Sequence, residues 1–451
     1  MRAIWVAAVL AVAANGARAA DDPHTRALAA GYKAAFLCSG VFNAGRSEAE
    51  IAADDLEGIY PEYQALVRTL PATVDRNAKT VSVAFDPTLP PRIAAWRPHL
   101  GCAQLPIGAG PDGVTKLPTL GIAREPASKA AWPAGDEQAT GKTPKALAPL
   151  LAKAFSDYGG KTTAVLVVKD GKIVGEQYRL GYDLYTPQRT WSAAKSLTAS
   201  VVGRAVQLGK VKVDAPANIP EWKAPGDPRA SITLAQLMHM GSGLWTDGPG
   251  NRTDEVYLAG GLVTEWATRM PLEVAPDSRF RYANNDTLLA ARSVRAALGD
   301  GADALAFPFT ELLWRIGMNH TTLETDWQGN YILSSQVWTT SRDLARLGLL
   351  YLNDGVWNGE RLLPAGWAKF VATPAPAQPP NGPGYGAFFW LHGPAQGLPE
   401  GTYAMNGNRG QYVFIVPSKK VVIVRRGFDS AQARFDDVRF ARDVLAALEA
   451  N

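Results

Sequence analysis

Cysteine and histidine are scarce in this chain of 451 residues, which contains 2 and 5 of them respectively. No histidine stands at ligand spacing from a cysteine, an aspartate or a glutamate, and a bound metal ion needs several such side chains close together. We therefore expect no metal ion and no other cofactor. The histidines are His24, His99, His239, His320 and His392.

Net charge and long apolar runs are also lacking. The formal net charge is +4, which is too small to indicate a nucleic acid or an anionic membrane as a partner. After residue 19, no segment has the roughly 18 uninterrupted apolar residues of a membrane-spanning helix. We expect a protein without a transmembrane segment that binds no nucleic acid.

Residues 1–19 have the pattern of a cleavable signal peptide. Arg2 precedes an apolar run from Ile4 to Ala14, and Ala17-Arg18-Ala19 fits a cleavage site. The run is too short to span a bilayer, and no cysteine follows the cleavage site to carry a lipid. The sequence predicts a periplasmic or secreted protein.

The two cysteines are Cys38 and Cys102. In an oxidising compartment an even number of cysteines favours a disulfide. The bridge would close a loop of about 64 residues and stabilise the fold by about 2–4 kcal/mol in the loop-entropy model. Two buried free thiols are the alternative that the sequence leaves open.

The part before residue 144 divides into two regions. Residues 20–103 form an accessory region without recognisable chemistry, and residues 104–143 form a linker that is rich in Pro, Gly, Ala and Lys. Within the accessory region the patterns predict one helix and two strands, at 24–37, 79–85 and 93–96.

The main body, residues 144–451, has the order helix, hairpin, helical middle, antiparallel strands, helix. This order predicts an α+β fold: helices flank an antiparallel β-sheet, and an all-helical insertion, about 210–330, separates the two halves of the sheet. The predicted helices are 144–158, 192–207, 341–352 with Ser341 as its cap, and 431–450; the predicted strands are 162–168, 173–178, 386–392, 402–406, 410–416 and 421–426.

The only Ser-x-x-Lys of the sequence is formed by Ser192 and Lys195. At the start of a helix these two positions share a face, so the lysine amine can reach the serine hydroxyl. A neutral lysine can take the serine proton, and the helix N-terminus offers N–H groups to an oxyanion. Neutrality near pH 7 requires the lysine pKa to fall by about 3 units. The alternative is an ordinary helix start with a capping serine.

Two further patterns follow along the chain. In Tyr282-x-Asn284 the phenol and the amide share one side of an extended segment, and a tyrosine near a lysine can serve as a general base and then as an acid. In the segment 405–412, which is predicted to enter a strand, glycines such as Gly410 let the backbone pass close to a ligand, and the Gln411 N–H is a candidate second oxyanion donor. The alternatives are a core tyrosine and a glycine that only marks the entry to a strand.

In this order and spacing, the three patterns resemble the serine β-lactamase and penicillin-binding protein superfamily. The similarity is greatest to its esterase and amidase branch, which includes class C-like serine hydrolases and 6-aminohexanoate-dimer hydrolases. It covers about residues 144–451, and it includes the segments 191–196, 238–244, 341–347, 358–364 and 410–412.

The resemblance implies an enzyme that forms an acyl-enzyme on a serine, and it assigns roles by motif. Ser192 would be the nucleophile, Lys195 and Tyr282 would transfer protons, Asn284 would orient Lys195 or the substrate, and the N–H groups of Ser192 and Gln411 would form the oxyanion hole.

One segment departs from the family pattern. Penicillin-recognising members present Lys-Thr-Gly where this chain has Asn408-Arg409-Gly410. The lysine that pairs with a β-lactam carboxylate is therefore missing, and Arg409 replaces it only if a β-bulge turns its side chain toward the substrate.

The favoured hypothesis is an exported serine hydrolase that cleaves a small ester or amide. A β-lactamase or D-Ala-D-Ala carboxypeptidase is the second, and a non-catalytic binding protein with the same fold is the third. Trp245, Tyr385 and Trp390 are candidates to line a substrate pocket.

Overall fold

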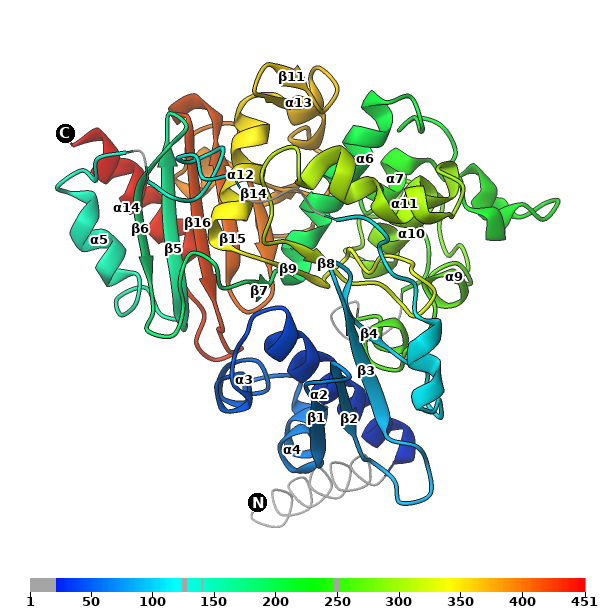
Figure 1. Cartoon of the computed structure of the whole chain (residues 1–451). Coiled ribbons are helices and arrows are strands. Elements are labelled where there is room, and N and C mark those ends of the chain that lie inside the picture. The colour runs from blue at the N-terminus through cyan, green and yellow to red at the C-terminus, as the bar shows by residue number, and fades with distance from the viewer. Residues whose placement is uncertain (1–21, 124–127, 140, 247–251, 451) are drawn as a thin grey trace, which may run out of the picture. The chain divides into compact units, whose positions relative to one another are not determined.

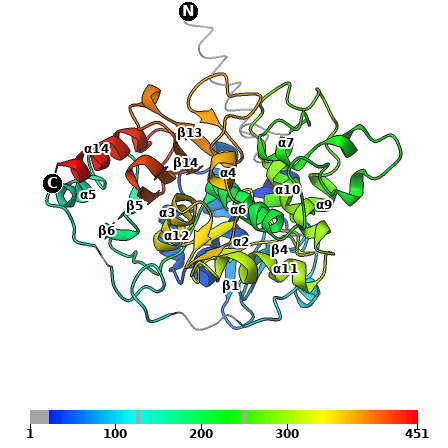
Figure 2. The same cartoon turned by 90° about the horizontal axis from the view of Figure 1, so that it is seen from above.

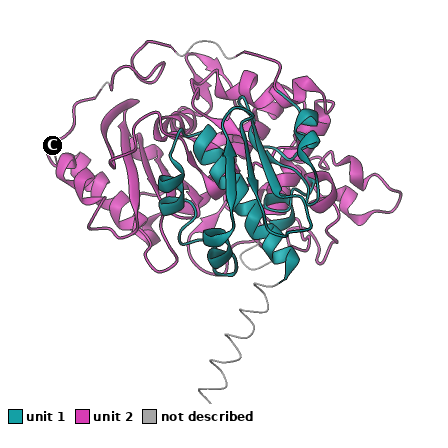
Figure 3. Ribbon diagram, turned by 60° about the horizontal axis from the view of Figure 1, so that its bottom comes forward, with its two compact units in different colours: residues 1–119, 254–262, 325–329 teal, residues 120–253, 263–324, 330–451 magenta. Residues whose placement is uncertain are grey.

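The computed structural model describes residues 22–123, 128–139, 141–246 and 252–450 (Figure 1). The predicted signal peptide, residues 1–19, lies outside the described residues. Contacts within the chain define two compact units, drawn in two colours in Figure 3. The first unit contains residues 1–119, 254–262 and 325–329, and the second contains residues 120–253, 263–324 and 330–451.

The first unit packs helices on a four-stranded antiparallel sheet of strand order β1-β2-β3-β4. Its longest helix, α2, begins where Asp22 caps the N–H of Thr25, and Cys38 on this helix forms a disulfide with Cys102 on β4. The predicted disulfide is therefore confirmed. The elements are α2 Pro23–Phe42, α3 Glu48–Asp54, α4 Pro61–Thr69, β1 Ala72–Asp75, β2 Thr80–Val83, β3 Arg92–Arg97, β4 Gly101–Gln104, η1 Pro111–Lys116 and α8 Asp254–Tyr257.

The second unit is built on a seven-stranded antiparallel sheet of order β12-β13-β14-β15-β16-β5-β6. A three-stranded sheet, β7-β9-β8, and a two-stranded one, β10-β11, accompany it. The strands are β5 Thr162–Lys169, β6 Lys172–Tyr178, β7 Gln188–Arg189, β8 Thr322–Leu323, β9 Val337–Thr339, β10 Val356–Trp357, β11 Glu360–Arg361, β12 Gly384–Tyr385, β13 Trp390–His392, β14 Thr402–Gly407, β15 Gln411–Val416 and β16 Val421–Gly427.

Helices cover both faces of the seven-stranded sheet. On one face α5 and α14 lie side by side, as Figures 1 and 2 show. They bury alternate strand residues such as Val165, Val167 and Ile423, because successive side chains of a strand point to opposite faces. Helix α12 packs on β5, β15 and β16 from the other side. This arrangement confirms the predicted α+β fold.

The remaining part of the second unit is mainly helical. Between residues 210 and 330 it contains short helices and, in its described residues, the one short strand β8. The helices are α5 Leu147–Lys153, η2 Trp191–Ala193, α6 Ala194–Gln207, η3 Pro220–Trp222, η4 Pro228–Ser231, α7 Leu234–Met238, α9 Val263–Trp266, α10 Asn284–Ala297, α11 Ala302–Pro308, η6 Phe309–Leu313, α12 Ser341–Leu352, α13 Trp367–Val371, η7 Pro394–Gln396, η8 Pro417–Lys419 and α14 Asp437–Glu449. No helix in the described ranges is both long and apolar enough to cross a bilayer.

Several predicted boundaries differ from the structure, each for a local reason. Helix α14 begins only at Asp437, because Asp436 caps it by accepting the N–H of Arg439. Thr340, and not Ser341, caps α12, since its hydroxyl accepts the N–H of Asp343. The predicted strand 386–392 is interrupted at Phe388, whose φ of 61° is not that of a strand.

Candidate active site

Ser192 stands in a strained turn between a strand and a helix. The chain leaves β7 at Arg189, makes the single turn η2, and continues as α6. Trp191, just before the serine, has a φ of 51°, which is an unfavourable backbone conformation for a bulky residue. The Arg189 guanidinium lies 4.2 Å from the centre of the Trp191 ring, and the Thr190 N–H donates to Val337 O at 2.8 Å. These contacts hold a half-exposed Ser192 at the start of the helix.

Lys195 is buried, and three oxygen atoms surround its amine. Its Nζ lies 2.7 Å from Asn284 Oδ1, 2.9 Å from Ser334 O and 3.2 Å from Ser192 Oγ. A neutral amine has two N–H donors and one lone pair. Since Asn284 Oδ1 and Ser334 O can only accept, they take the two donors and leave the lone pair to the Ser192 hydroxyl. The structure thus gives neutral Lys195 the geometry of a base toward Ser192.

The environment of Lys195 also favours the neutral amine. Burial lowers the pKa of Lys195 to about 7, and the negative charge of Asp286 opposes that decrease. A substantial fraction of the side chain is therefore neutral at physiological pH. This pKa is close to the value that the Ser-x-x-Lys pattern requires of a base near pH 7.

Tyr282 and Asn284 reach Lys195 together. Ala283 between them is extended, so their side chains share one side of the chain. Asn284 is the first residue of α10, and the Lys195 Nζ lies 4.9 Å from the centre of the half-exposed Tyr282 ring. The structure therefore brings the phenol ring and the amide to the same amine.

An aromatic cluster supports Tyr282. Its ring stacks on Trp390 at 5.5 Å and meets Tyr385 edge-on at 5.9 Å between centroids. Tyr385 also contacts Trp390 and Phe280, at 4.9 and 5.2 Å. Tyr385 is buried, whereas Trp390 and Phe280 are half-exposed. The proposed proton-transfer tyrosine therefore adjoins an aromatic surface that solvent can reach.

The side chains of residues 408–411 are not brought to the serine. These residues were predicted to enter a strand, but Arg409 and Gly410 have φ of 59° and 80°, so residues 408–410 form the turn between β14 and β15. The exposed Asn408 accepts the N–H of Arg409. The buried Arg409 guanidinium donates to Asp429 O and lies over the Phe428 ring. The Gln411 amide bonds to Arg409 O, Gly427 O and Arg426.

Gly407, which was not among the predicted site residues, lies directly against the serine turn. A Cβ added there would be 2.1 Å from Thr190 O and 3.1 Å from Ala193 N. Only a residue without a side chain lets the end of β14 approach η2 so closely. The sequence signal was the glycine at position 407, which lies inside the segment 405–412 that we singled out.

Two other contributors to the site were also missed. Ser334 acts through its backbone oxygen, which no side-chain pattern can indicate. Asp286 is 2% exposed and accepts a 2.8 Å hydrogen bond from Ser242 Oγ. Burial raises the pKa of Asp286 to about 7. Its position two residues after Asn284 was the available signal.

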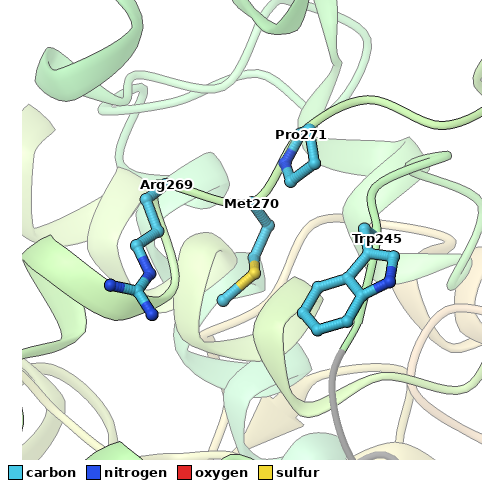
Figure 4. Close-up of a pocket in the computed structure, with 4 residues that line it drawn as sticks. All are labelled: Trp245, Arg269, Met270 and Pro271. Atoms are coloured by element: carbon cyan, nitrogen blue, oxygen red, sulfur yellow. The ribbon is translucent and has the colours of Figure 1, made fainter.

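A separate surface pocket of about 420 Å³ is lined by Trp245, Arg269, Met270 and Pro271, as Figure 4 shows. Trp245 therefore lines a pocket apart from the predicted catalytic residues, whereas Tyr385 and Trp390 pack on Tyr282. None of the predicted catalytic residues lines this pocket. In the part of the chain that the structure describes, no group of three or more His, Cys, Asp or Glu side chains is arranged to hold a metal ion.

Comparison with known proteins gives consistent matches. Residues 147–446 match the family model described as Beta-lactamase. The chain is similar to the 6-aminohexanoate-dimer hydrolase of Paenarthrobacter ureafaciens, with 24% identity over 58% of this chain and 72% of that protein. The fold is similar to that of a solved structure assigned as a 6-aminohexanoate-dimer hydrolase from Bacillus anthracis (TM-score 0.55, 22% identity, 66% of this chain and 80% of that one). It is also similar to that of a family VIII carboxylesterase (TM-score 0.53, 16% identity, 70% of this chain and 100% of that one).

Proposed function

The chain belongs to the beta-lactamase family of serine hydrolases, and from this premise we propose that it cleaves a small ester or amide through an acyl-enzyme on Ser192. The observation that carries the proposal is the arrangement at Lys195. Its two N–H donors have fixed acceptors, and its lone pair faces the Ser192 hydroxyl at 3.2 Å. The relative from Paenarthrobacter ureafaciens is named as a 6-aminohexanoate-dimer hydrolase, which supports a small substrate of this class.

In the first half of the reaction, neutral Lys195 takes the proton of the Ser192 hydroxyl, and Oγ attacks the substrate carbonyl carbon. Backbone N–H groups at the start of α6 stabilise the oxyanion that forms. The proton then passes, through Lys195 and Tyr282, to the leaving alcohol or amine as its bond to the carbonyl carbon breaks. In the second half, water attacks the acyl-enzyme and gives up a proton to the same groups, which releases the acid and restores Ser192.

The turn at residues 408–410 supports an ester or amide over a β-lactam as the substrate. Binding the carboxylate of a β-lactam requires a cation beside the nucleophile. Arg409 is the cation of this turn, and its guanidinium is buried against Asp429 O and Phe428. The half-exposed rings of Phe280 and Trp390 next to Tyr282 favour an apolar group on the substrate instead.

Turnover of p-nitrophenyl esters, short amides and a β-lactam by the parent and by Ser192→Ala tests the proposal. We expect the parent to hydrolyse at least one ester or amide and the variant to lose about 10³-fold or more in kcat, because the nucleophile is gone. Ser196→Ala is the matched control, since Ser196 lies one turn further along α6 and its hydroxyl donates to Phe388 O.

A fluorophosphonate probe should label Ser192 in the parent and in Ser196→Ala. Equal turnover by the parent and Ser192→Ala would overturn the proposal. Efficient turnover of the β-lactam alone would favour the β-lactamase alternative, and a folded parent that no electrophile acylates would favour a binding protein.

We also propose that the chain is exported with residues 1–19 removed. The pattern of Arg2, the apolar run and Ala17-Arg18-Ala19 supports this location, and so does a disulfide between Cys38 and Cys102. N-terminal sequencing of protein recovered outside the cytoplasm should begin at Ala20. Full-length protein that keeps Met1 and remains in the cytoplasm would contradict export.

A further inference from the structure

Asp286 is a buried carboxyl group that the reaction above does not use. It lies in the first turn of α10, two residues after Asn284, and it is 2% exposed. Among the residues that the structure describes, no cation lies within ion-pair distance of it. Burying a carboxylate without a cation costs free energy of folding. We therefore expect Asp286 to have a functional reason for its position beside the proposed catalytic groups.

The groups that face Asp286 come from three elements. Ser242, in the loop after α7, donates its hydroxyl to the carboxyl at 2.8 Å. Lys195 on α6 and Tyr385 on β12 interact with it electrostatically. Lys195 in turn faces Ser192, Asn284, Ser334 O and Tyr282. The charge of Asp286 therefore acts on the proposed base, Lys195.

The charge of Asp286 acts on Lys195 in one direction. A negative charge favours the protonated amine, and burial strengthens the interaction because little water screens it. Burial also brings the pKa values of Asp286 and Lys195 both to about 7. The two groups therefore titrate as a coupled pair, in which the protonation of one changes that of the other.

We propose that Asp286 is a positioning residue which, through its charge and its hydrogen bond with Ser242, sets the pH range in which Lys195 acts as the base. It need not touch the substrate. The inference rests on the proposed function, because it assigns to Asp286 control over the protonation of the proposed base.

The test is the pH dependence of kcat/KM for the parent and Asp286→Asn, from about pH 5 to about pH 9. The asparagine removes the charge and keeps nearly the same shape. Without the negative charge, Lys195 loses its proton at a lower pH. We therefore expect the acid limb of the profile, where kcat/KM rises with pH, to move to lower pH by about 1 unit. The pH dependence of the rate of labelling by a fluorophosphonate should move in the same direction.

Asp277→Asn is the matched control. Asp277 is a carboxylate in the nearby loop before α10, but it accepts from Gln236 and acts on His239 rather than on Lys195. The same loss of charge there should leave the acid limb in place. An acid limb of Asp286→Asn that coincides with that of the parent, or an equal movement in both variants, overturns the proposal.

Ser242→Ala provides a second variant that decides the question if Asp286→Asn does not fold. Loss of the hydroxyl donor favours protonated Asp286, so the acid limb should again move to lower pH, by a smaller amount, and an unmoved limb counts against the proposal. Failure of this inference is distinguishable from failure of the proposed function: if Ser192→Ala retains activity, the function fails, and if only the acid limbs stay in place, the role of Asp286 fails.

Discussion

At the scale of single residues, the site depends on an amine that is charged in water and partly neutral in the protein. Lys195 makes no ion pair with Asp286, and the burial of its amine outweighs the attraction of that carboxylate. Asn284 Oδ1 and Ser334 O accept hydrogen bonds from the two N–H groups of the neutral amine. The buried amine therefore has a hydrogen-bond partner for each of its donors.

Replacing Lys195 tests whether its neutral form matters. Arginine stays protonated at all working pH values, so Lys195→Arg keeps a cation but removes the base. We expect kcat/KM to fall by about 10²–10⁴-fold in Lys195→Arg, and similarly in Lys195→Met. For the parent, the neutral fraction increases as the pH rises through about 7, so kcat/KM should increase over that range.

Steady-state kinetics against pH on the best ester of the panel would measure both effects. Lys195→Arg with near-parental activity would show that a positive charge, rather than a base, is what the reaction needs at this position.

The sequence predicted some candidate site residues that the structure brings together and others that it does not. It selected Ser192, Lys195, Tyr282 and Asn284, which the structure brings together, because their spacing along the chain reflects helix and strand periodicity. It also selected Arg409, whose side chain instead bonds to Asp429 O; the oxyanion role of the Gln411 N–H stays a prediction. No local pattern reports where a side chain in a turn finds a partner 20 residues away along the chain.

At the scale of elements, the serine is positioned by the contact between a strand end and a helix start. The end of β14 reaches η2 at Gly407, where a side chain would overlap Thr190 O. Before the turn, β7 pairs with β9, and the Thr190 N–H donates to Val337 O. The left-handed backbone of Trp191 is retained between these two contacts.

Gly407→Ala tests that contact. Its Cβ would lie 2.1 Å from Thr190 O, a backbone atom that cannot move without moving the serine turn. We expect the variant to fold but to lose at least about 10-fold in kcat/KM, because a small displacement of a nucleophile is costly. Gly393→Ala is the control, since a Cβ there meets nothing within 4 Å.

Kinetics and fluorophosphonate labelling rates of these two glycine variants provide the measurement. If Gly407→Ala and Gly393→Ala were equally active, the approach of β14 to η2 would have no part in placing Ser192.

At the scale of the whole molecule, the first unit gathers segments that are far apart in the sequence. Residues 254–262 and 325–329 join residues 1–119. A side chain at Gly31 on α2 would overlap Leu258 O, and Arg92 and Gln104 donate to the backbone oxygens of Leu258 and Tyr257. The boundary of this unit at residue 119 falls inside the predicted linker 104–143.

The disulfide gives the prediction that belongs to this scale. Cys38 and Cys102 are separated by 64 positions, so the bridge restricts a long loop of the unfolded chain. Replacing both by alanine should lower the free energy of unfolding by about 2–4 kcal/mol. Urea unfolding of the parent and the double variant, followed by far-UV circular dichroism, would measure the loss.

Reductant supplies the control for this experiment. It should lower the stability of the parent toward that of the double variant and leave the variant unchanged. Parent and variant with the same urea midpoint under oxidising conditions would contradict a stabilising bridge.

The sequence by itself predicted the fold class, named the two cysteines that could pair and selected Ser192, Lys195 and Tyr282 as proposed catalytic residues, because periodicity, cysteine number and short motifs can be read without the fold. Only the tertiary structure decided that Gly407 lies against the serine turn, that Arg409 is buried away from it, and that Asp286 is buried where its charge acts on Lys195. Those three results depend on contacts between segments distant along the chain, where burial and the position of each partner select the orientation of a side chain.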